Sequence, residues 1–313
     1  MAIVLGVTRP KMILDCDPGH DDAMAILLAG VHADLLGLTS VSGNAPLAAT
    51  TRNALMVAQI ADIDVPVHAG ADRPLMIEPK HAGHVHGESG LDGPVLPELT
   101  RTVASNDAVS FIIDTVRSTD DVWLMPIGPM TNIALAIRQA PDIVDKIAGI
   151  SFMGGSTGQG NVTAAAEFNI WADPHAAQIV ISSGVPKIIM AGLNLTKQYT
   201  FGPDLAARMI ALGTATGVFS GQVIGSYIDA ATRLRVSNEA HLHDPCAVLA
   251  ITHPDLFETS RHHVDVSTGR VTAGMTVVDQ RGYGGAEPNV DVLTTIDRAP
   301  AVEVLIDAIA TYR

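Results

Sequence analysis

Four carboxylates fall within eight residues near the start of this sequence, and they constrain its fold and chemistry more than any other stretch. Residues 15–22 read Asp-Cys-Asp-Pro-Gly-His-Asp-Asp and directly follow the apolar run Met12–Leu14. The apolar run predicts a short buried strand, and the aliphatic stretch Ala23–Ala29 predicts a helix after the acids. The acids are therefore expected at the carboxyl end of a strand, where ligand sites gather in open parallel α/β sheets.

The charge of this cluster predicts a bound cation. Alternation along a strand points Asp15 and Asp17 to one side and Cys16 to the other, while Asp21 and Asp22 open the next helix, whose dipole favours acids. So many negative groups repel one another unless a cation or strong donors share the site. Ligand sets made only of oxygen suit Ca²⁺ or Mg²⁺. The alternative is a set of helix-capping acids without a metal, although capping needs one Asp rather than four.

The composition excludes several classes of protein. The chain has 313 residues, of which 47% are hydrophobic and only 4% aromatic, as in sheets that helices cover on both faces. The formal charge of −14 argues against binding to nucleic acid or an anionic membrane. Two cysteines imply no disulfide framework, and the segment Met1–Lys11 is too short and too broken to predict a signal peptide. We expect a soluble, cytoplasmic protein.

Strand-like and helix-like stretches alternate along most of the chain. We expect strands over residues 35–42, 66–69, 122–126, 146–153, 187–191, 264–266 and 290–294, and helices over 47–61, 106–117, 130–138, 174–183 and most of 202–235, with further helices after residues 244 and 300. This alternation predicts one α/β domain over residues 1–313, with a mostly parallel central sheet flanked by helices. The aperiodic connection from Gly70 to Arg101 predicts a functional loop or lid.

A second acidic motif, His241-Leu242-His243-Asp244-Pro245, precedes an apolar helical stretch. Its carboxylate could complete a cation site begun by Asp17 and Asp22. His243 is a candidate acid, because the unperturbed pKa of histidine lies near neutrality. The structural alternative is a helix cap beside a surface histidine.

Three other features carry weaker signals. The glycine-rich segment Gly154–Gly160 lacks the Lys-Ser/Thr ending of a P-loop, so we interpret it as a flexible substrate loop. The spacing of His81, His84 and His86 resembles a transition-metal site, but we do not expect one in this polar loop. The amides of Asn44 and Asn169 suit sugar hydroxyls, although each is also an ordinary turn residue.

Taken in order, these residues resemble the inosine–uridine nucleoside hydrolase family. Its opening motif, Asp-x-Asp-Pro-Gly-x-Asp-Asp, is matched from Asp15 to Asp22. The match continues through Gly43-Asn44, His86-Gly87-Glu88-Ser89-Gly90-Leu91-Asp92-Gly93-Pro94, Gly128-Pro129-Met130-Thr131-Asn132, Glu167-Phe168-Asn169 and His243-Asp244. The resemblance covers nearly the whole chain. It implies a Rossmann-like nucleoside hydrolase fold, hydrolysis of the N-glycosidic bond of ribonucleosides, and a homo-oligomer, either a dimer or a tetramer.

The resemblance also implies roles for individual residues. Asp17, Asp22, Asp244 and the backbone carbonyl of Ile127 would bind Ca²⁺, with Asp15 among or beside these ligands. Asp21 would be the general base on the attacking water, and His243 would protonate the leaving base. The residues implied in substrate binding are Asn44, His86, Met153, Asn161, Glu167, Phe168 and Asn169.

Within the family, the resemblance places this chain in the less base-restricted or pyrimidine-preferring branch. Members of the purine-specific branch lack the histidine at His243 and activate the base by aromatic stacking. The base-contacting region is expected within residues 222–241, where Tyr227, Arg233 and His241 are candidates. A site built around the ribose hydroxyls should strongly prefer ribosides to deoxyribosides.

Two other classes of protein remain open on the sequence alone. An Asp-x-Asp turn after the first strand also opens haloacid-dehalogenase-type phosphatases, but that class needs Thr or Ser where Gly19 stands. A non-enzymatic nucleoside- or Ca²⁺-binding module would not need a reactive Asp21 or His243. If Asp17 and Asp244 share one ion, Cys16 and Cys246 come from neighbouring stretches of backbone. Because strand alternation turns Cys16 away from the site, we predict that both are reduced, buried thiols.

Overall fold

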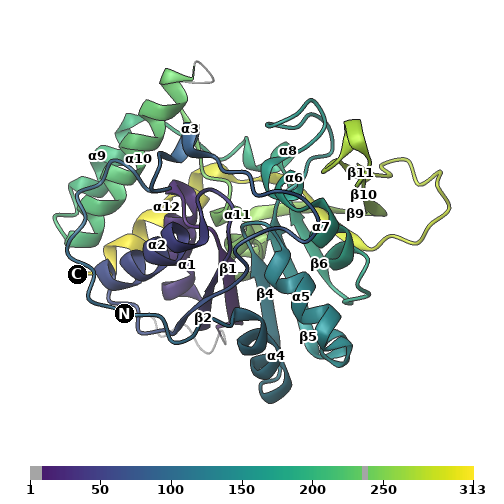
Figure 1. The fold of residues 1–313 in the computed structure, drawn as a ribbon. Coiled ribbons are helices and arrows are strands. Elements are labelled where there is room, and N and C mark those ends of the chain that lie inside the picture. Colours follow the sequence, from purple (N-terminus) through teal and green to yellow (C-terminus); the bar gives the residue numbers. More distant parts are fainter. Residues whose placement is uncertain (1–8, 235–238) are drawn as a thin grey trace.

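A computed structural model describes residues 9–234 and 239–313 of the chain. Its centre is an eight-stranded sheet in the order β3-β2-β1-β4-β5-β6-β12-β9 (Figure 1). The strands are β1 (Lys11–Cys16), β2 (Asp34–Ser40), β3 (Val67–Ala69), β4 (Val122–Pro126), β5 (Ile147–Met153), β6 (Ile188–Ala191), β9 (Phe257–His262) and β12 (Val290–Ile296). All neighbours pair in parallel except β12 and β9. The predicted α/β fold with a mostly parallel sheet is confirmed.

Helices cover both faces of this sheet, and β1 shows why. Met12, Leu14 and Cys16 pack into one apolar core, whereas Ile13 packs into the other. The first core also receives α1 (His20–His32), α2 (Leu47–Ile60), α9 (Pro203–Ile210), α10 (Ala215–Arg233), α11 (Pro245–Thr252) and α12 (Arg298–Ala310). The second receives α4 (Ala108–Ser118), α5 (Thr131–Gln139) and α7 (Pro174–Ile181). A strand buried on both faces is apolar at nearly every position, as this one is.

The remaining elements are short and lie at the ends of the sheet. They are α3 (Gly83–His86), α6 (Phe168–Ala172), α8 (Leu193–Thr196), the pair β7 (Thr200–Phe201) and β8 (Ala240–His241), the pair β10 (Val264–Val266) and β11 (Thr276–Val278), and the 3₁₀ turns η1 (Pro141–Lys146), η2 (Pro254–Leu256) and η3 (Arg270–Thr272). In Figure 1, α9 and α10 lie at one end of the molecule, and β10 and β11 lie at the other.

Several boundaries differ from the sequence predictions. β1 continues through Asp15 and Cys16, because Asp15 still pairs with Thr39 on β2. The helical stretch from residue 202 divides into α9 and α10 at Gly213, which has a φ of 71°, and its predicted end at Arg235 lies outside the described residues. Strand β9 was not predicted, because its side chains are exposed or half-buried and show no regular apolar alternation.

The long connection after β3 is held against the carboxyl end of the parallel strands. The backbone N–H of Leu75 donates to Asp173, and that of Ala82 donates to the carbonyl of Asn44. Both cysteines are buried free thiols, as predicted, with Cys16 packed on the side of β1 opposite Asp15. None of the helices in the described part of the chain has the length and apolar character that crossing a bilayer requires.

Candidate active site

The acidic motif lies where the strand order of the sheet reverses. From β1 the chain proceeds to β2 and β3 on one side, and β4, β5 and β6 follow on the other. The strand order therefore reverses between β1 and β4. The two strand ends are joined here by a hydrogen bond of 2.8 Å from the N–H of Ile127 to the carbonyl of Asp15. Such a switch point is the usual ligand site of an open parallel sheet. The sequence motif therefore lies at the position expected from its place after the first strand.

Three buried carboxylates meet at this point. Asp21, Asp22 and Asp244 each place an oxygen within 4.8 Å of the others. Asp22 is fixed by the N–H groups of Asp17 and Gly19, at 3.1 and 2.9 Å. The backbone N–H groups of His243 and Asp244 lie close enough to Asp21 to favour its ionised form, so the second acidic motif lies next to the first.

Burial and mutual repulsion make these acids hard to ionise. Burial, followed by the charge of Asp22, raises the pKa of Asp21 to about 8. The pKa values of Asp17, Asp22 and Asp244 are also raised, with burial as the main cause. A positive charge at this point would favour the ionised form of all four.

The donor set suits a hard divalent cation. Oδ1 of Asp17 is buried and has no hydrogen-bond partner among the residues that the structure describes. Its other oxygen accepts from the N–H of Asn44 at 2.6 Å. An unpartnered buried carboxylate oxygen is costly, and coordination of a cation would satisfy it. Oxygen donors from Asp17, Asp22 and Asp244 are of the type that Ca²⁺ and Mg²⁺ prefer.

Asp15 is a further buried carboxylate, and its Oδ2 has no hydrogen-bond partner among the residues that the structure describes. Its Oδ1 accepts from the Thr39 hydroxyl at 2.6 Å and from Nδ2 of Asn132 at 2.7 Å. Burial raises its pKa to about 7, although these hydrogen bonds oppose the shift. Its predicted place among or beside the cation ligands stays a prediction.

A cavity of about 550 Å³ opens above the acids. A volume of this size suits a small-molecule ligand. Of the residues proposed from the sequence, it is lined by Asp21, Asn44, His86, Ile127, Met153, Asn161, Glu167, Phe168, Asn169, His243 and Asp244. Asp15, Asp17 and Asp22 are fully buried and are not among its lining residues. The sequence candidates thus come together around one cavity.

Three of the residues predicted to bind the sugar, Met153, Glu167 and Asn169, belong to one hydrogen-bonded part of the cavity lining. Glu167 caps α6 by accepting from the N–H groups of Asn169 and Ile170, and burial raises its pKa to about 7. Nδ2 of Asn169 donates to the carbonyls of Ile127 and Met153, at 2.7 and 3.1 Å. The carbonyl of Ile127, a predicted cation ligand, is therefore hydrogen-bonded to Asn169, a residue predicted to bind the sugar.

His243 stands on another wall, together with His241 and Tyr227. Its Nδ1 lies 2.7 Å from the hydroxyl oxygen of Thr196. Burial, with smaller contributions from His241 and Lys197, lowers its pKa to about 3. The ring is therefore neutral near pH 7.

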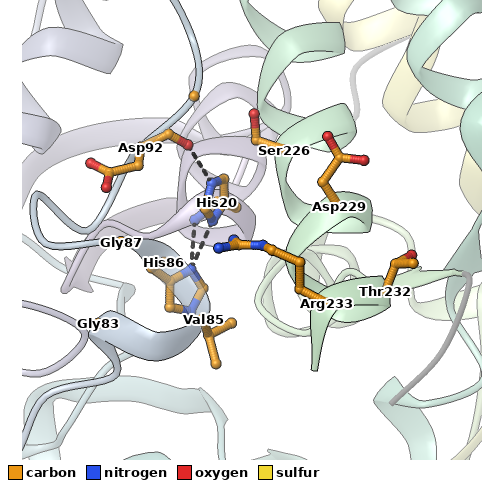
Figure 2. Close-up of a pocket in the computed structure, with 11 residues that line it drawn as sticks. His20, Gly83, Val85, His86, Gly87, Asp92, Ser226, Asp229, Thr232 and Arg233 are labelled. Carbon is orange, nitrogen blue, oxygen red and sulfur yellow. Dashed lines mark hydrogen bonds between the residues drawn. The ribbon is translucent and has the colours of Figure 1, made fainter. Parts of the chain in front are cut away.

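A second cavity, of about 580 Å³, shares Val85 and His86 with the first. Figure 2 shows His20 between His86 and the carbonyl of Asp92, with 2.9 Å from its Nδ1 to Nδ1 of His86 and 2.9 Å from its Nε2 to the carbonyl oxygen. Arg233, a candidate base contact from the sequence, lines this second cavity instead. The reason is helical periodicity, because Tyr227 and Ala231 on α10, with Leu234 directly after it, recur on the face that borders the first cavity.

Sequence reasoning missed the contribution of α8. Leu193 and Lys197 line the first cavity, and Thr196 contacts His243. Their position in the sequence could have indicated this role, because they follow β6 at the same edge of the sheet as the acids. Asn132, which donates to Asp15, was recognised as part of a motif but was assigned no role.

Known proteins are similar to this chain in sequence and in fold. A family model described as inosine-uridine preferring nucleoside hydrolase matches residues 12–303. The pyrimidine-specific ribonucleoside hydrolase RihB of Escherichia coli (strain K12) is 44% identical over 293 residues, which cover 92% of this chain and 93% of that protein. The solved structure of a purine-preferring ribonucleoside hydrolase from Gardnerella vaginalis has a TM-score of 0.90 at 32% identity, covering 96% of this chain and 98% of that one. An inosine-guanosine nucleoside hydrolase gives 0.87 at 26% identity, covering 97% and 99%.

Proposed function

This chain belongs to the inosine-uridine preferring nucleoside hydrolase family, and we propose that it hydrolyses the N-glycosidic bond of ribonucleosides, with pyrimidine ribonucleosides preferred and Ca²⁺ as the cofactor. One arrangement supports this reaction above all. Buried acids border the same cavity as a ring N–H donor at His243 and an amide-rich wall at Asn169. Such a cavity can activate water, hold a ribose and assist a departing base.

The acids provide both the cation site and the base. Asp17, Asp22 and Asp244 would hold the ion, with the Ile127 carbonyl as a further donor. When bound, a divalent cation would supply positive charge that favours ionisation of water and orients the ribose hydroxyls. Asp21 takes the proton from the attacking water, because the charge of a bound cation would favour the ionised form of this buried carboxyl, which is the form that accepts a proton.

Cleavage of the N-glycosidic bond develops positive charge on the ribose and negative charge on the base, and the cavity has side chains that can stabilise both charges. The ribose acquires oxocarbenium character as the bond to the base breaks, and the surrounding carboxylates and amides stabilise that positive charge. The bonding electrons leave with the base, where negative charge develops. The ring N–H of His243 donates a hydrogen bond that stabilises this charge. As the base takes that proton, the ring takes another from solvent and stays neutral, and the oxygen of the water becomes bound to the sugar carbon.

The walls of the cavity divide substrate recognition between sugar and base. Asn161, Glu167 and Asn169 would bind the ribose hydroxyls, with Asn44, Met153, His86 and Phe168 completing the contact. The base would lie near Tyr227, His241 and His243. The pyrimidine preference is supported by the 44% identity to a protein named as pyrimidine-specific. A homo-oligomer and a cytoplasmic location stay predictions from the sequence.

A panel of nucleosides tests the proposal. Purified protein is incubated with uridine, cytidine, inosine and adenosine, with and without chelator, and free base is measured. We expect base release from uridine and cytidine fastest, and none after chelation. Faster release from inosine or adenosine would overturn the pyrimidine preference. Tight binding of every nucleoside with no release from any would indicate a nucleoside-binding module instead.

A further inference from the structure

The hydroxyl of Thr196 is buried and has a single hydrogen-bond partner within residues 9–234 and 239–313, the Nδ1 atom of His243. The Thr196 side chain has no exposed surface, and the oxygen-to-nitrogen distance is 2.7 Å. Thr196 ends α8, whose first turn is fixed by the N–H of Leu193 on the carbonyl of Gly155 at 2.8 Å. The hydroxyl is therefore held by the fold in contact with one nitrogen of the ring.

The direction of this hydrogen bond follows from which polar atom each direction would leave without a hydrogen-bond partner. If Nδ1 carried the proton and donated it, the Thr196 O–H would be a buried donor without an acceptor. If the hydroxyl donates, only lone pairs on its oxygen stay unused. An unsatisfied buried donor is the more costly of the two, because an O–H has only one hydrogen to place. The hydroxyl therefore donates to a bare Nδ1.

We propose that Thr196 is a positioning residue that holds His243 in the tautomer carrying its proton on Nε2, the ring nitrogen available to the substrate in the cavity. This inference rests on the proposed hydrolase function and deepens it. A neutral imidazole has one N–H, and the hydrogen bond made by the other nitrogen decides where that proton resides. Without Thr196, the two tautomers compete, and the wrong one presents a lone pair to the departing base.

The structure also offers matched variants. Thr196→Val removes the hydroxyl but keeps the branched shape, and Thr196→Ser restores the hydroxyl. Thr216→Val is the control for losing a buried threonine hydroxyl, because Thr216 is equally buried and donates to the carbonyl of Ile60 at the end of α2.

The discriminating measurement compares leaving groups. Uridine needs help as its base departs, whereas p-nitrophenyl riboside releases a stable phenolate. We expect Thr196→Val to lower kcat for uridine by about 10- to 100-fold, which is part of the roughly 10²- to 10⁴-fold that a positioned acid contributes, with little change in KM. It should leave cleavage of the p-nitrophenyl riboside nearly unchanged. Thr196→Ser and Thr216→Val should behave as wild type on both substrates.

A direct reading of the ring completes the test. The ¹⁵N shifts of labelled histidine distinguish a bare from a protonated ring nitrogen, and His243→Gln identifies the signal. We expect a bare Nδ1 in the wild type and a mixed state in Thr196→Val. Equal losses on both substrates, or a protonated Nδ1 in the wild type, would overturn the role of Thr196. If the wild type cleaves neither substrate, it is the hydrolase function itself that fails.

Discussion

Asp17 packs its carboxylate against the Cα of Gly128, at a point where a side chain on residue 128 would collide with Oδ1 of that carboxylate. This is the buried oxygen without a hydrogen-bond partner in the described structure. Residue 128, the second after β4, therefore has to be glycine, so that the acid that follows β1 can occupy the switch point of the sheet. Gly43, after β2, makes room for the other oxygen of Asp17 in the same way.

Gly128→Ala should accordingly disable the cation site without disturbing the core. We expect the variant to lose the rise in melting temperature that Ca²⁺ gives to chelator-treated wild type, and to lose activity by at least about 10-fold, as when groups supporting a metal site are altered. Gly158→Ala is the control, because nothing lies within 4 Å of a Cβ there. An undiminished Ca²⁺ response in Gly128→Ala would show that Asp17 does not serve the ion.

Asp21→Asn should separate proton transfer from cation binding. We expect its kcat for uridine to fall by roughly 10²- to 10⁴-fold, the contribution of a general base, while the Ca²⁺-dependent rise in melting temperature persists. Asp22→Asn and Asp244→Asn should lose that rise. Calorimetric titration with Ca²⁺ and steady-state kinetics measure the two effects. Full activity in Asp21→Asn would show that Asp21 is not the general base.

Recognition of the ribose should make the 2′-hydroxyl essential. We expect kcat/KM for thymidine to lie about 10³- to 10⁵-fold below that for 5-methyluridine, because the analogue leaves buried polar groups unpaired. The two compounds carry the same base and differ only at the 2′ position, so the base cannot explain a difference. Comparable rates would place the sugar-binding wall elsewhere.

A pair of histidines outside the active site should make stability depend on pH. His32 and His253 pack edge to face, with ring centroids 4.6 Å apart, and burial lowers the pKa of His32 from 6.5 to about 4. The unfolded chain therefore binds more protons between these values, so stability present above pH 6.5 is lost as the pH falls towards 4. Because the ring is partly solvated, we expect only about 1 kcal/mol from it.

Urea unfolding at pH 7.5 and 5 measures this contribution as a difference between variants. His32→Asn should lose less stability over this interval than the wild type does. His262→Asn, at a histidine on β9, is the control and should follow the wild type. Parallel losses in all three proteins would assign the pH dependence to other groups.

The sequence predicted those parts of the fold whose local pattern and tertiary setting agree. The strand before Asp15, the acids in the first turn of α1 and the location of the site at a strand end all follow from a few adjacent residues. The side on which Cys16 packs also followed from simple alternation. These features need no knowledge of distant segments.

The features that the sequence did not predict depend on contacts between distant segments. α8 is only four residues long, and no periodicity marks it, because its position depends on the loop after β5. Strand β9 exists because it pairs antiparallel with β12, more than 20 residues later. The pairing of Thr196 with His243 spans 47 residues and could not be read from either motif. Helical spacing alone does predict that Arg233 and Tyr227 lie on different faces of α10, and therefore that Arg233 does not border the first cavity.

The most direct test of the central claim is the fate of uridine in ¹⁸O-labelled water with Ca²⁺ and no phosphate, followed by mass spectrometry. The account predicts free uracil and ribose that carries one ¹⁸O at the anomeric carbon before exchange, with neither product from Asp21→Asn. Uracil release that requires phosphate and gives a sugar phosphate, or intact uridine retained at the site, would contradict hydrolysis by this cluster of acids.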